Sequence, residues 1–221
     1  MGDKVWLCTP SAVEAEAINQ LWSQGPCFVT GVGAVATTEA LWRRFHEEGI
    51  PHAIVVLGLA GAYDKELPLY TGVQVRKEVW GALGRRGLRR LTPLPPFLIG
   101  DFAIQVESLA PALPLPQVTG LTLESVSACR KEAAFWKRTY PYAAIETQEN
   151  AAYLRFGEVL RVPVYALRVI SNRVGVRHWD RVAALEALAT FARDVGLPLY
   201  QGLVDGASRA GSGDEFWGWG V

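Results

Sequence analysis

The feature that most constrains the fold is the mostly apolar run VPVYALRVI at residues 162–170. Its β-branched and aliphatic side chains predict a strand that is buried on both faces of a parallel sheet. Sheets of this kind need helices on both faces, which indicates an α/β fold. Ser171, Asn172 and Arg173 follow directly, so polar side chains are expected just past the carboxyl end of this strand.

A second polar cluster follows another predicted strand end. The short apolar segment 143–145 leads into Glu146, Thr147, Gln148 and Glu149, and residues 150–160 have helical composition. In open α/β sheets, ligands bind outside the carboxyl ends of the strands. The two polar clusters therefore predict a ligand-binding site at one end of the sheet.

Length and charge limit the class of protein and of partner. The 221 residues are enough for one domain with a large core, which we expect to span residues 1–205, followed by a tail at 206–221 that contains Gly, Ser and Trp. Lys and Arg together number 22, as do Asp and Glu, so the formal net charge is zero. This balance does not favour a nucleic acid or an anionic membrane as partner, and a small molecule is expected instead.

The sequence also bears on location and redox state. No apolar run approaches the roughly 18 residues of a membrane span, and Glu14 and Glu16 occupy the region where a signal peptide would need an apolar core. We therefore expect a cytoplasmic protein. Its cysteines, Cys8, Cys27 and Cys129, form no CxxC pair, which argues against a disulfide framework or a zinc site and predicts buried, inert thiols.

The remaining elements follow from periodicity and from turn residues. A helix is expected after the N-cap candidate Ser11, with Glu14 in its first turn. Residues 85–96 predict a solvated loop or a flap, and residues 97–106 are ambiguous, with a hairpin as one reading. Strands are predicted at 5–8, 27–30, 53–57, 71–80 and 118–127, and helices at 13–22, 34–48, 131–139 and 179–195.

Two glycine-containing segments follow predicted strands. Gly31 and Gly33 precede a helix, where glycines let the backbone approach a ligand, although a tight turn explains them equally well. The small residues at 58–62 leave space either for packing or for a ligand. A dinucleotide-binding reading of Gly31-x-Gly33 fails, because position 36 is Ala and the acidic residues at 47 and 48 lie in a predicted helix rather than at a strand end.

Five segments together carry a resemblance to a known family: VTGVG at 29–33, GLAGA at 58–62, TLESVS at 122–127, ETQE at 146–149 and RVISN at 168–172. In this order and spacing, the chain resembles the purine nucleoside phosphorylase and nucleosidase superfamily, and within it the futalosine hydrolases. The resemblance covers about residues 4–195. It implies a three-layer α/β fold, in which helices flank a central, mixed and partly curled sheet and a purine nucleoside lies across the strand ends. It also implies a homo-oligomer that needs no metal or other cofactor.

The resemblance assigns roles that agree with the chemistry of N-glycosidic cleavage, whose transition state resembles an oxocarbenium ion. Asn172 is the candidate for binding the base, Glu149 for accepting hydrogen bonds from the ribose hydroxyls, and Glu14 for orienting and deprotonating water. Arg168 resembles the arginine that helps to hold this water. Further substrate contacts are expected from Gln148, Gly58, Leu59, Ala60 and Ser127.

Each assignment has a structural alternative. Glu14 and Glu149 also suit the first turn of a helix, Arg168 suits a buried ion pair, and Asn172 suits a turn. Glu16 competes with Glu14 for the role of orienting water. The aromatic residue that stacks on the base stays open among Trp80, Phe135 and Trp136.

The chain departs from the pattern of its nucleosidase relatives at two positions. Gln148 and Asn150 flank the predicted sugar-binding glutamate, where nucleosidase relatives commonly have Met and a small residue. A phosphorylase would need basic side chains for phosphate, but residues 9–13 contain none and position 56 is Val. A non-catalytic nucleoside-binding module remains a further alternative.

Because relatives specific for 6-amino purines carry Asp at the position of Asn172, the amide predicts a 6-oxopurine, with futalosine as the leading substrate.

Overall fold

The computed structural model describes residues 4–21, 27–81, 83–87, 91–93, 104–176 and 178–211. Its main feature is an eight-stranded mixed sheet, in which β3, β9, β8, β4 and β10 pair in turn and β10 pairs again with β3. These strands therefore form a closed ring, and β1 and β2 extend the sheet beyond it. The strands of this sheet are β1 Val5–Thr9, β2 Phe28–Val29, β3 Ala53–Ala62, β4 Gly72–Trp80, β7 Gln105–Glu107, β8 Gln117–Thr122, β9 Ile145–Thr147 and β10 Val164–Arg173.

Because β3 is long, it belongs both to the closed ring and to the part of the sheet that β1 and β2 extend. One edge of its first half pairs with β1, beginning at Val5 opposite Ala53, while the end of the same strand pairs with β9, with Gly61 opposite Glu146. Its other edge pairs with β10 along almost its whole length. Since β10 is parallel to β3 but antiparallel to β4, the predicted mixed, partly curled sheet is confirmed.

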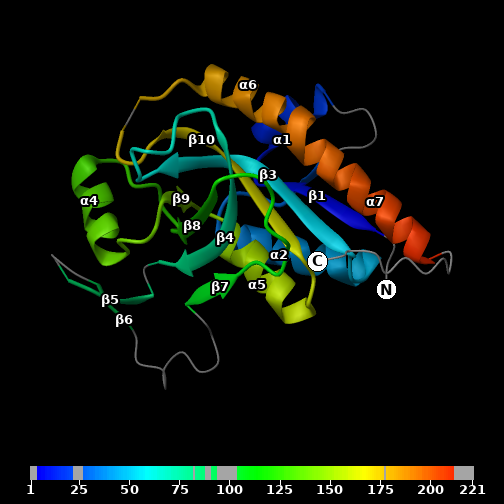
Figure 1. Ribbon diagram of the computed structural model, residues 1–221. Coiled ribbons are helices and arrows are strands. Elements are labelled where there is room, and N and C mark those ends of the chain that lie inside the picture. Colours follow the sequence, from blue (N-terminus) through cyan, green and yellow to red (C-terminus); the bar gives the residue numbers. More distant parts are fainter. Residues whose placement is uncertain are drawn as a thin grey trace.

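Helices cover both faces of the sheet (Figure 1). Because alternate residues of a strand point to opposite faces, Val55 and Leu57 pack with α1, α6 and α7, whereas Ile54 and Val56 pack with α2 and α5. The predicted three-layer architecture is thus confirmed. The helices are α1 Ala12–Asn19, α2 Ala34–Glu48, α4 Arg130–Thr139, α5 Asn150–Leu160, α6 Arg181–Phe191, the π-helical turn Ala192–Gly196 and α7 Leu197–Gly211.

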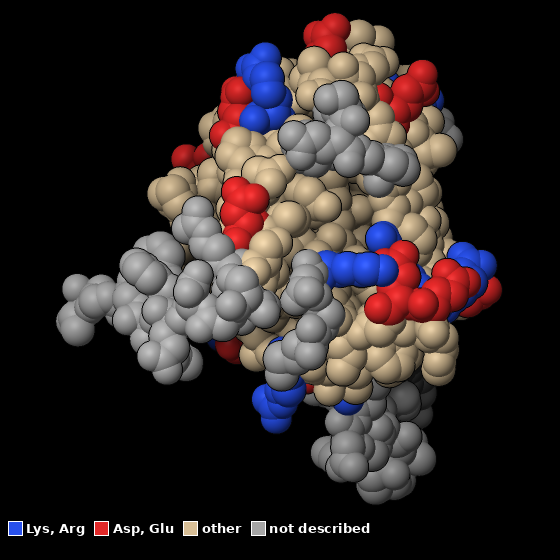
Figure 2. Space-filling view, turned by 90° about the vertical axis from the view of Figure 1, so that its right-hand side faces the viewer, with Lys and Arg blue, Asp and Glu red and all other residues tan. Residues whose placement is uncertain are grey.

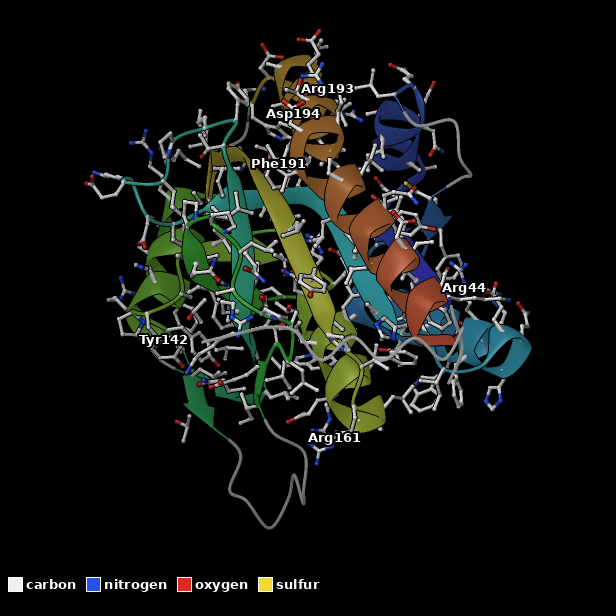
Figure 3. The ribbon with its side chains drawn as sticks, turned by 45° about the vertical axis from the view of Figure 1, so that its right-hand side comes forward. Arg44, Tyr142, Arg161, Phe191, Arg193 and Asp194 are labelled. Carbon is white, nitrogen blue, oxygen red and sulfur yellow. The ribbon has the colours of Figure 1, made fainter. Side chains whose placement is uncertain are left out.

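Close packing of α6 and of the turn after it depends on glycines. A Cβ on Gly72 of β4 would run into the ring of Phe191, which is labelled in Figure 3, and a Cβ on Gly196 would press on Leu57. The sequence predicted that this helix would end near residue 195. Instead, the π-helical turn continues directly into α7. Pro198 lies just after this turn and has no N–H to donate to a carbonyl of the preceding turn. The predicted boundary at residue 205 falls inside α7, and residues 212–221 lie outside the described part of the chain.

Three strand ends differ from the sequence prediction. β3 continues through the small residues to Ala62, because β10 pairs with it there. β10 itself includes residues 171–173, which we expected just beyond the strand, and β8 ends at Thr122 rather than at residue 127. Each difference moves residues between strand and loop without moving the end of the sheet at which the polar side chains gather.

Within the predicted flap, β5 Gly84–Arg86 pairs with β6 Leu91–Pro93 as a small antiparallel pair that projects from the body of the molecule (Figure 1). Residues 88–90 and 94–103, including most of the segment read as an ambiguous hairpin, lie outside the described residues. On the face in Figure 2, acidic and basic side chains are interspersed and neither sign dominates. No described helix combines the length and the apolar composition that a membrane crossing requires.

Candidate active site

A cavity of about 640 Å³ lies where β3, β9 and β10 end, beside the first turn of α1 and the loop before α2. Its volume is in the range of small-molecule sites. The wall includes Glu14, Leu59, Ala60, Ser127, Gln148, Glu149 and Asn172. Gly58 and Arg168, the other predicted site residues, lie directly behind this wall. The structure thus gathers residues from distant parts of the chain at the sheet end that the sequence indicated.

Glu14 both caps α1 and faces the cavity. Its Oε2 accepts hydrogen bonds from the backbone N–H of Ser11 (3.1 Å) and from its hydroxyl (2.6 Å), which completes a capping box. Its Oε1 accepts from the Leu59 N–H at 2.8 Å. The capping role and the catalytic role are therefore compatible, because the box fixes the carboxylate at the cavity wall. Glu16, the competing candidate, lies exposed on α1 beside a separate hollow.

Arg168 lies behind the wall because Gly58 makes room for it. The two residues are register partners in β10 and β3, and a Cβ on Gly58 would collide with Arg168 Nη1 and lie 3.1 Å from Glu14 Oε1. Arg168 is fully buried, and among the described residues its Nη1 has no hydrogen-bond partner. This donor and the Glu14 carboxylate therefore both lie close to Gly58, next to the cavity wall.

Glu149 is the N-cap residue of α5 and is buried. Its Oε1 accepts from the Gly33 N–H at 3.2 Å, and its Oε2 lies 3.7 Å from Arg168 Nη2. Burial raises the pKa of Glu149, while the Arg168 charge and the Gly33 hydrogen bond partly oppose this rise. Gly31 and Gly33 both have positive φ angles, 91° and 94°, so the loop is a tight turn whose amide points toward a cavity residue.

Asn172 reaches the cavity through an irregularity in β10. The register shifts between Ile170 and Asn172, so Ser171 is the extra residue of a bulge. The Ser171 hydroxyl donates to Asn172 Oδ1 at 2.7 Å, and Asn172 Nδ2 donates to the Arg173 carbonyl at 3.0 Å. The bulge re-aims the amide into the site and these bonds set its orientation.

Glu146 is a cavity residue to which the sequence assigned no role. Its Oε1 accepts from the Ser127 N–H (2.8 Å), and its Oε2 accepts from the Ser127 hydroxyl (2.6 Å) and from the Tyr63 hydroxyl. Ser127, a predicted substrate contact, thus uses both donors to hold Glu146. Burial and the neighbouring Glu146 raise the pKa of Tyr63, which keeps this phenol protonated. The acidic cluster at 146–149 was the signal, but sequence alone did not separate the two glutamates.

The sequence also missed Glu78, a fully buried carboxylate of β4. It accepts from Thr122 Oγ1 at 2.8 Å and from Thr147 Oγ1 at 3.0 Å. Burial raises the pKa of Glu78 to about 7, against the opposing effect of its hydrogen bonds. A glutamate in an alternating strand usually faces solvent, so no sequence signal distinguished this one.

The aromatic and cysteine expectations need correction. Phe135 and Trp136 pack in a core cluster, and the aromatic side chain in the described cavity wall is Trp179, which is 37% exposed. Trp80 is likewise not a wall residue.

Burial raises the pKa of Cys8 and Cys27 to about 12, so both are inert thiols as predicted. Cys129, however, is exposed rather than buried.

No protein-family model matches the chain. A curated futalosine hydrolase of Thermus thermophilus is 34% identical over 183 residues, which cover 74% of this chain and 77% of that protein.

Solved structures share the fold at low sequence identity. A futalosine hydrolase of Helicobacter pylori superposes with a TM-score of 0.70 at 15% identity, covering 92% of this chain and 98% of that one. A 5'-methylthioadenosine/S-adenosylhomocysteine nucleosidase of Campylobacter jejuni gives 0.73 at 15% identity, covering 90% and 100%. The Thermus thermophilus relative identifies the branch within this shared fold, and the chain belongs to the futalosine hydrolase family of nucleosidases.

Proposed function

We propose that the protein hydrolyses the N-glycosidic bond of futalosine, releasing hypoxanthine and dehypoxanthine futalosine, a step of menaquinone biosynthesis. The observation that carries the proposal is the convergence of Glu14, Glu149 and Asn172 on one cavity at the ends of β3, β9 and β10. Cleavage needs a general base for water, a partner for the cationic sugar and a group that stabilises the departing purine. The three side chains supply these functions.

In this proposal, the Glu14 carboxylate takes a proton from water as the water oxygen bonds to the anomeric carbon. The bond between that carbon and the purine nitrogen breaks, and its electron pair stays with the purine, which takes up a proton from solvent while Glu14 later releases the proton of the water to solvent. The Leu59 N–H and Ser11 hold the carboxylate in position. Arg168 Nη1, which has no partner in the described part of the chain, would donate to the same water.

Glu149 would accept hydrogen bonds from the ribose hydroxyls, with Gln148 beside it in the wall. Because its pKa is raised by burial, a bound cationic sugar would favour its ionised form as the bond breaks. Asn172 would bind the base, and its amide would stabilise the charge spreading over N7 and O6 by about 3 kcal/mol, the scale of one oxyanion-hole donor.

The same residues weigh against the nearest alternatives. A phosphorylase must neutralise a phosphate dianion, but residues 9–13 beside Glu14 contain no basic side chain and residue 56 is Val. A nucleosidase for adenine-bearing substrates would gain from an acid at position 172, which could protonate N7, and an amide cannot do so.

The deciding experiment measures base release with and without phosphate, using futalosine, aminodeoxyfutalosine and methylthioadenosine at equal concentration. We expect phosphate-independent release of hypoxanthine from futalosine as the fastest reaction. Strict phosphate dependence with a sugar 1-phosphate as product would establish a phosphorylase instead. Faster release of adenine would overturn the role of Asn172, and binding without any turnover would favour a non-catalytic module.

We also propose a cytoplasmic homo-oligomer. Support for the oligomer comes from four exposed valines, of which Val32 (58% exposed) and Val126 (61%) line the cavity, while Val35 (74%) and Val182 (67%) lie in the first turns of α2 and α6. Such side chains are suited to contact with a second copy of the chain. Light scattering at several concentrations tests this, and a mass of 24.2 kDa throughout would show a monomer.

A further inference from the structure

Among the described residues, the guanidinium of Arg168 is only partly hydrogen-bonded. Its guanidinium is fully buried, and Nε and Nη2 both donate to Asn150 Oδ1, at 2.9 Å and 2.5 Å. Glu149 lies 3.7 Å from Nη2, which adds charge compensation without a short hydrogen bond. Nη1, with no partner among the described residues, lies beside Gly58 and close to Glu14 Oε1. Asn150 therefore determines where this donor points.

Asn150 can do so only if its amide is held in one orientation. A flipped amide would place its NH₂ group against the guanidinium, donor against donor. The Asn150 Nδ2 donates to Glu78 Oε2 at 3.4 Å, and this oxygen is the acceptor whenever it carries no proton. Glu78 thereby favours the orientation in which Oδ1 faces Arg168.

Glu78 is itself held on several sides. Thr122 and Thr147 donate to its Oε1 at 2.8 Å and 3.0 Å, and a Cβ on Gly120 of the neighbouring strand would collide with its carboxylate. The Thr122 hydroxyl also accepts from the Ala151 N–H, in the first turn of α5. The fold thus provides a closely fitted space for a carboxylate beneath the N-terminus of α5.

A buried charged network of this kind is not an efficient way to stabilise a fold, since apolar side chains of similar volume often do as well. Within the described part of the chain, the network ends on a donor without a partner, Arg168 Nη1, which lies beside the proposed general base. We propose that Glu78 and Asn150 are a positioning pair for Arg168, which fixes the guanidinium so that Nη1 reaches the hydrolytic water. The proposal rests on the proposed function for the identity of that water.

The test is a double-mutant cycle on base release from futalosine. Asn150→Ala should lower kcat by roughly 10²-fold, the scale of a small misplacement in an active site, and should change KM less than about threefold. Arg168→Gln should lower kcat at least as much, and adding Asn150→Ala to it should have little further effect, because Asn150 acts through Arg168. Multiplication of the two effects would overturn the proposal.

Glu78 is tested by a severe and a conservative variant. Glu78→Leu removes the acceptor for Asn150 and should lower kcat, whereas Glu78→Gln can still accept from Nδ2 and should recover most of that loss. Gln74→Leu is the matched control, because Gln74 is also fully buried on β4 but bonds to Pro111 and Leu113 in the connector before β8. It should lower thermal stability without lowering kcat. Equal losses of kcat in Gln74→Leu and Glu78→Leu would show a merely structural role.

A second readout does not depend on activity. In ¹⁵N NMR spectra, the Arg168 Nε–H signal, assigned by its loss in Arg168→Gln, should exchange slowly with solvent in the wild type and in Gln74→Leu. It should exchange faster in Asn150→Ala and in Glu78→Leu. An unchanged signal in Asn150→Ala would refute the positioning role. Failure of the wild type to release any base would refute the proposed function alone, because this comparison would still decide how Arg168 is held.

Discussion

Replacing Glu14 with Gln probes the general base and the helix cap together. The wild-type carboxylate accepts three hydrogen bonds, from the Ser11 N–H, the Ser11 hydroxyl and the Leu59 N–H, at 3.1, 2.6 and 2.8 Å. Glutamine offers a single oxygen, so its NH₂ group must face at least one of these donors. One buried hydrogen bond is then lost, which lowers the free energy of unfolding by roughly 1–3 kcal/mol. Such a loss is smaller than the stability of a typical domain, so the variant should fold.

The effect on the reaction should be larger than the effect on stability. Loss of a positioned general base lowers kcat by roughly 10²- to 10⁴-fold, or about 3–5 kcal/mol in the activation barrier. Base release and thermal unfolding, measured on the same preparations, separate the two effects.

Two controls belong with this experiment. Glu16→Gln changes an exposed residue of the same helix and should leave kcat and stability nearly unchanged. Ser11→Ala removes the cap but keeps the base, so it should lower stability by about 0.5–2 kcal/mol with a smaller fall in kcat. Near-normal turnover of a folded Glu14→Gln variant, or a large loss in Glu16→Gln, would refute the assignment of the base.

Three further substitutions test other parts of the site. Asn172→Asp should raise the ratio of kcat/KM for adenine-bearing over hypoxanthine-bearing substrates by about tenfold or more, as one reversed hydrogen bond allows, and an unchanged ratio would remove Asn172 from base selection. Gly58→Ala places a Cβ against Arg168 Nη1 and should lower both kcat and Tm, whereas Gly202→Ala, with nothing within 4 Å of its added Cβ, should lower neither. Glu78 has a folded pKa of about 7, above its unfolded value of 4.5, so its stabilising contribution is complete below about pH 4.5 and is lost as the pH rises through 7. Urea unfolding from pH 4.5 to 8 should therefore show about 3 kcal/mol less pH dependence in Glu78→Gln than in the wild type, and parallel curves would contradict the raised pKa.

The sequence determined the layers and the end of the sheet that carries the site. The apolar runs that became β1, β3 and β10 alternate between two buried faces, and this pattern requires helices on both sides. The polar clusters at 146–149 and 171–173 mark strand ends by their position alone. The sequence thus predicted that Glu149 and Asn172 would share one site. The strand direction behind that prediction differs, because β9 is antiparallel to β3 and the two residues meet through the pairing of β9 with the end of β3.

Only the tertiary structure decided what each side chain contacts. Gly58 is explained not by a ligand but by the guanidinium of Arg168, which comes from a strand more than a hundred residues away. Glu78 and Asn150 meet because β4 and α5 are neighbours in space, and neither residue carries a local signal of that contact. Local patterns report which face of a strand or helix is buried, because burial depends on the spacing of apolar residues. Hydrogen-bond partners depend instead on strand register and on helix placement, which arise only when the whole chain packs.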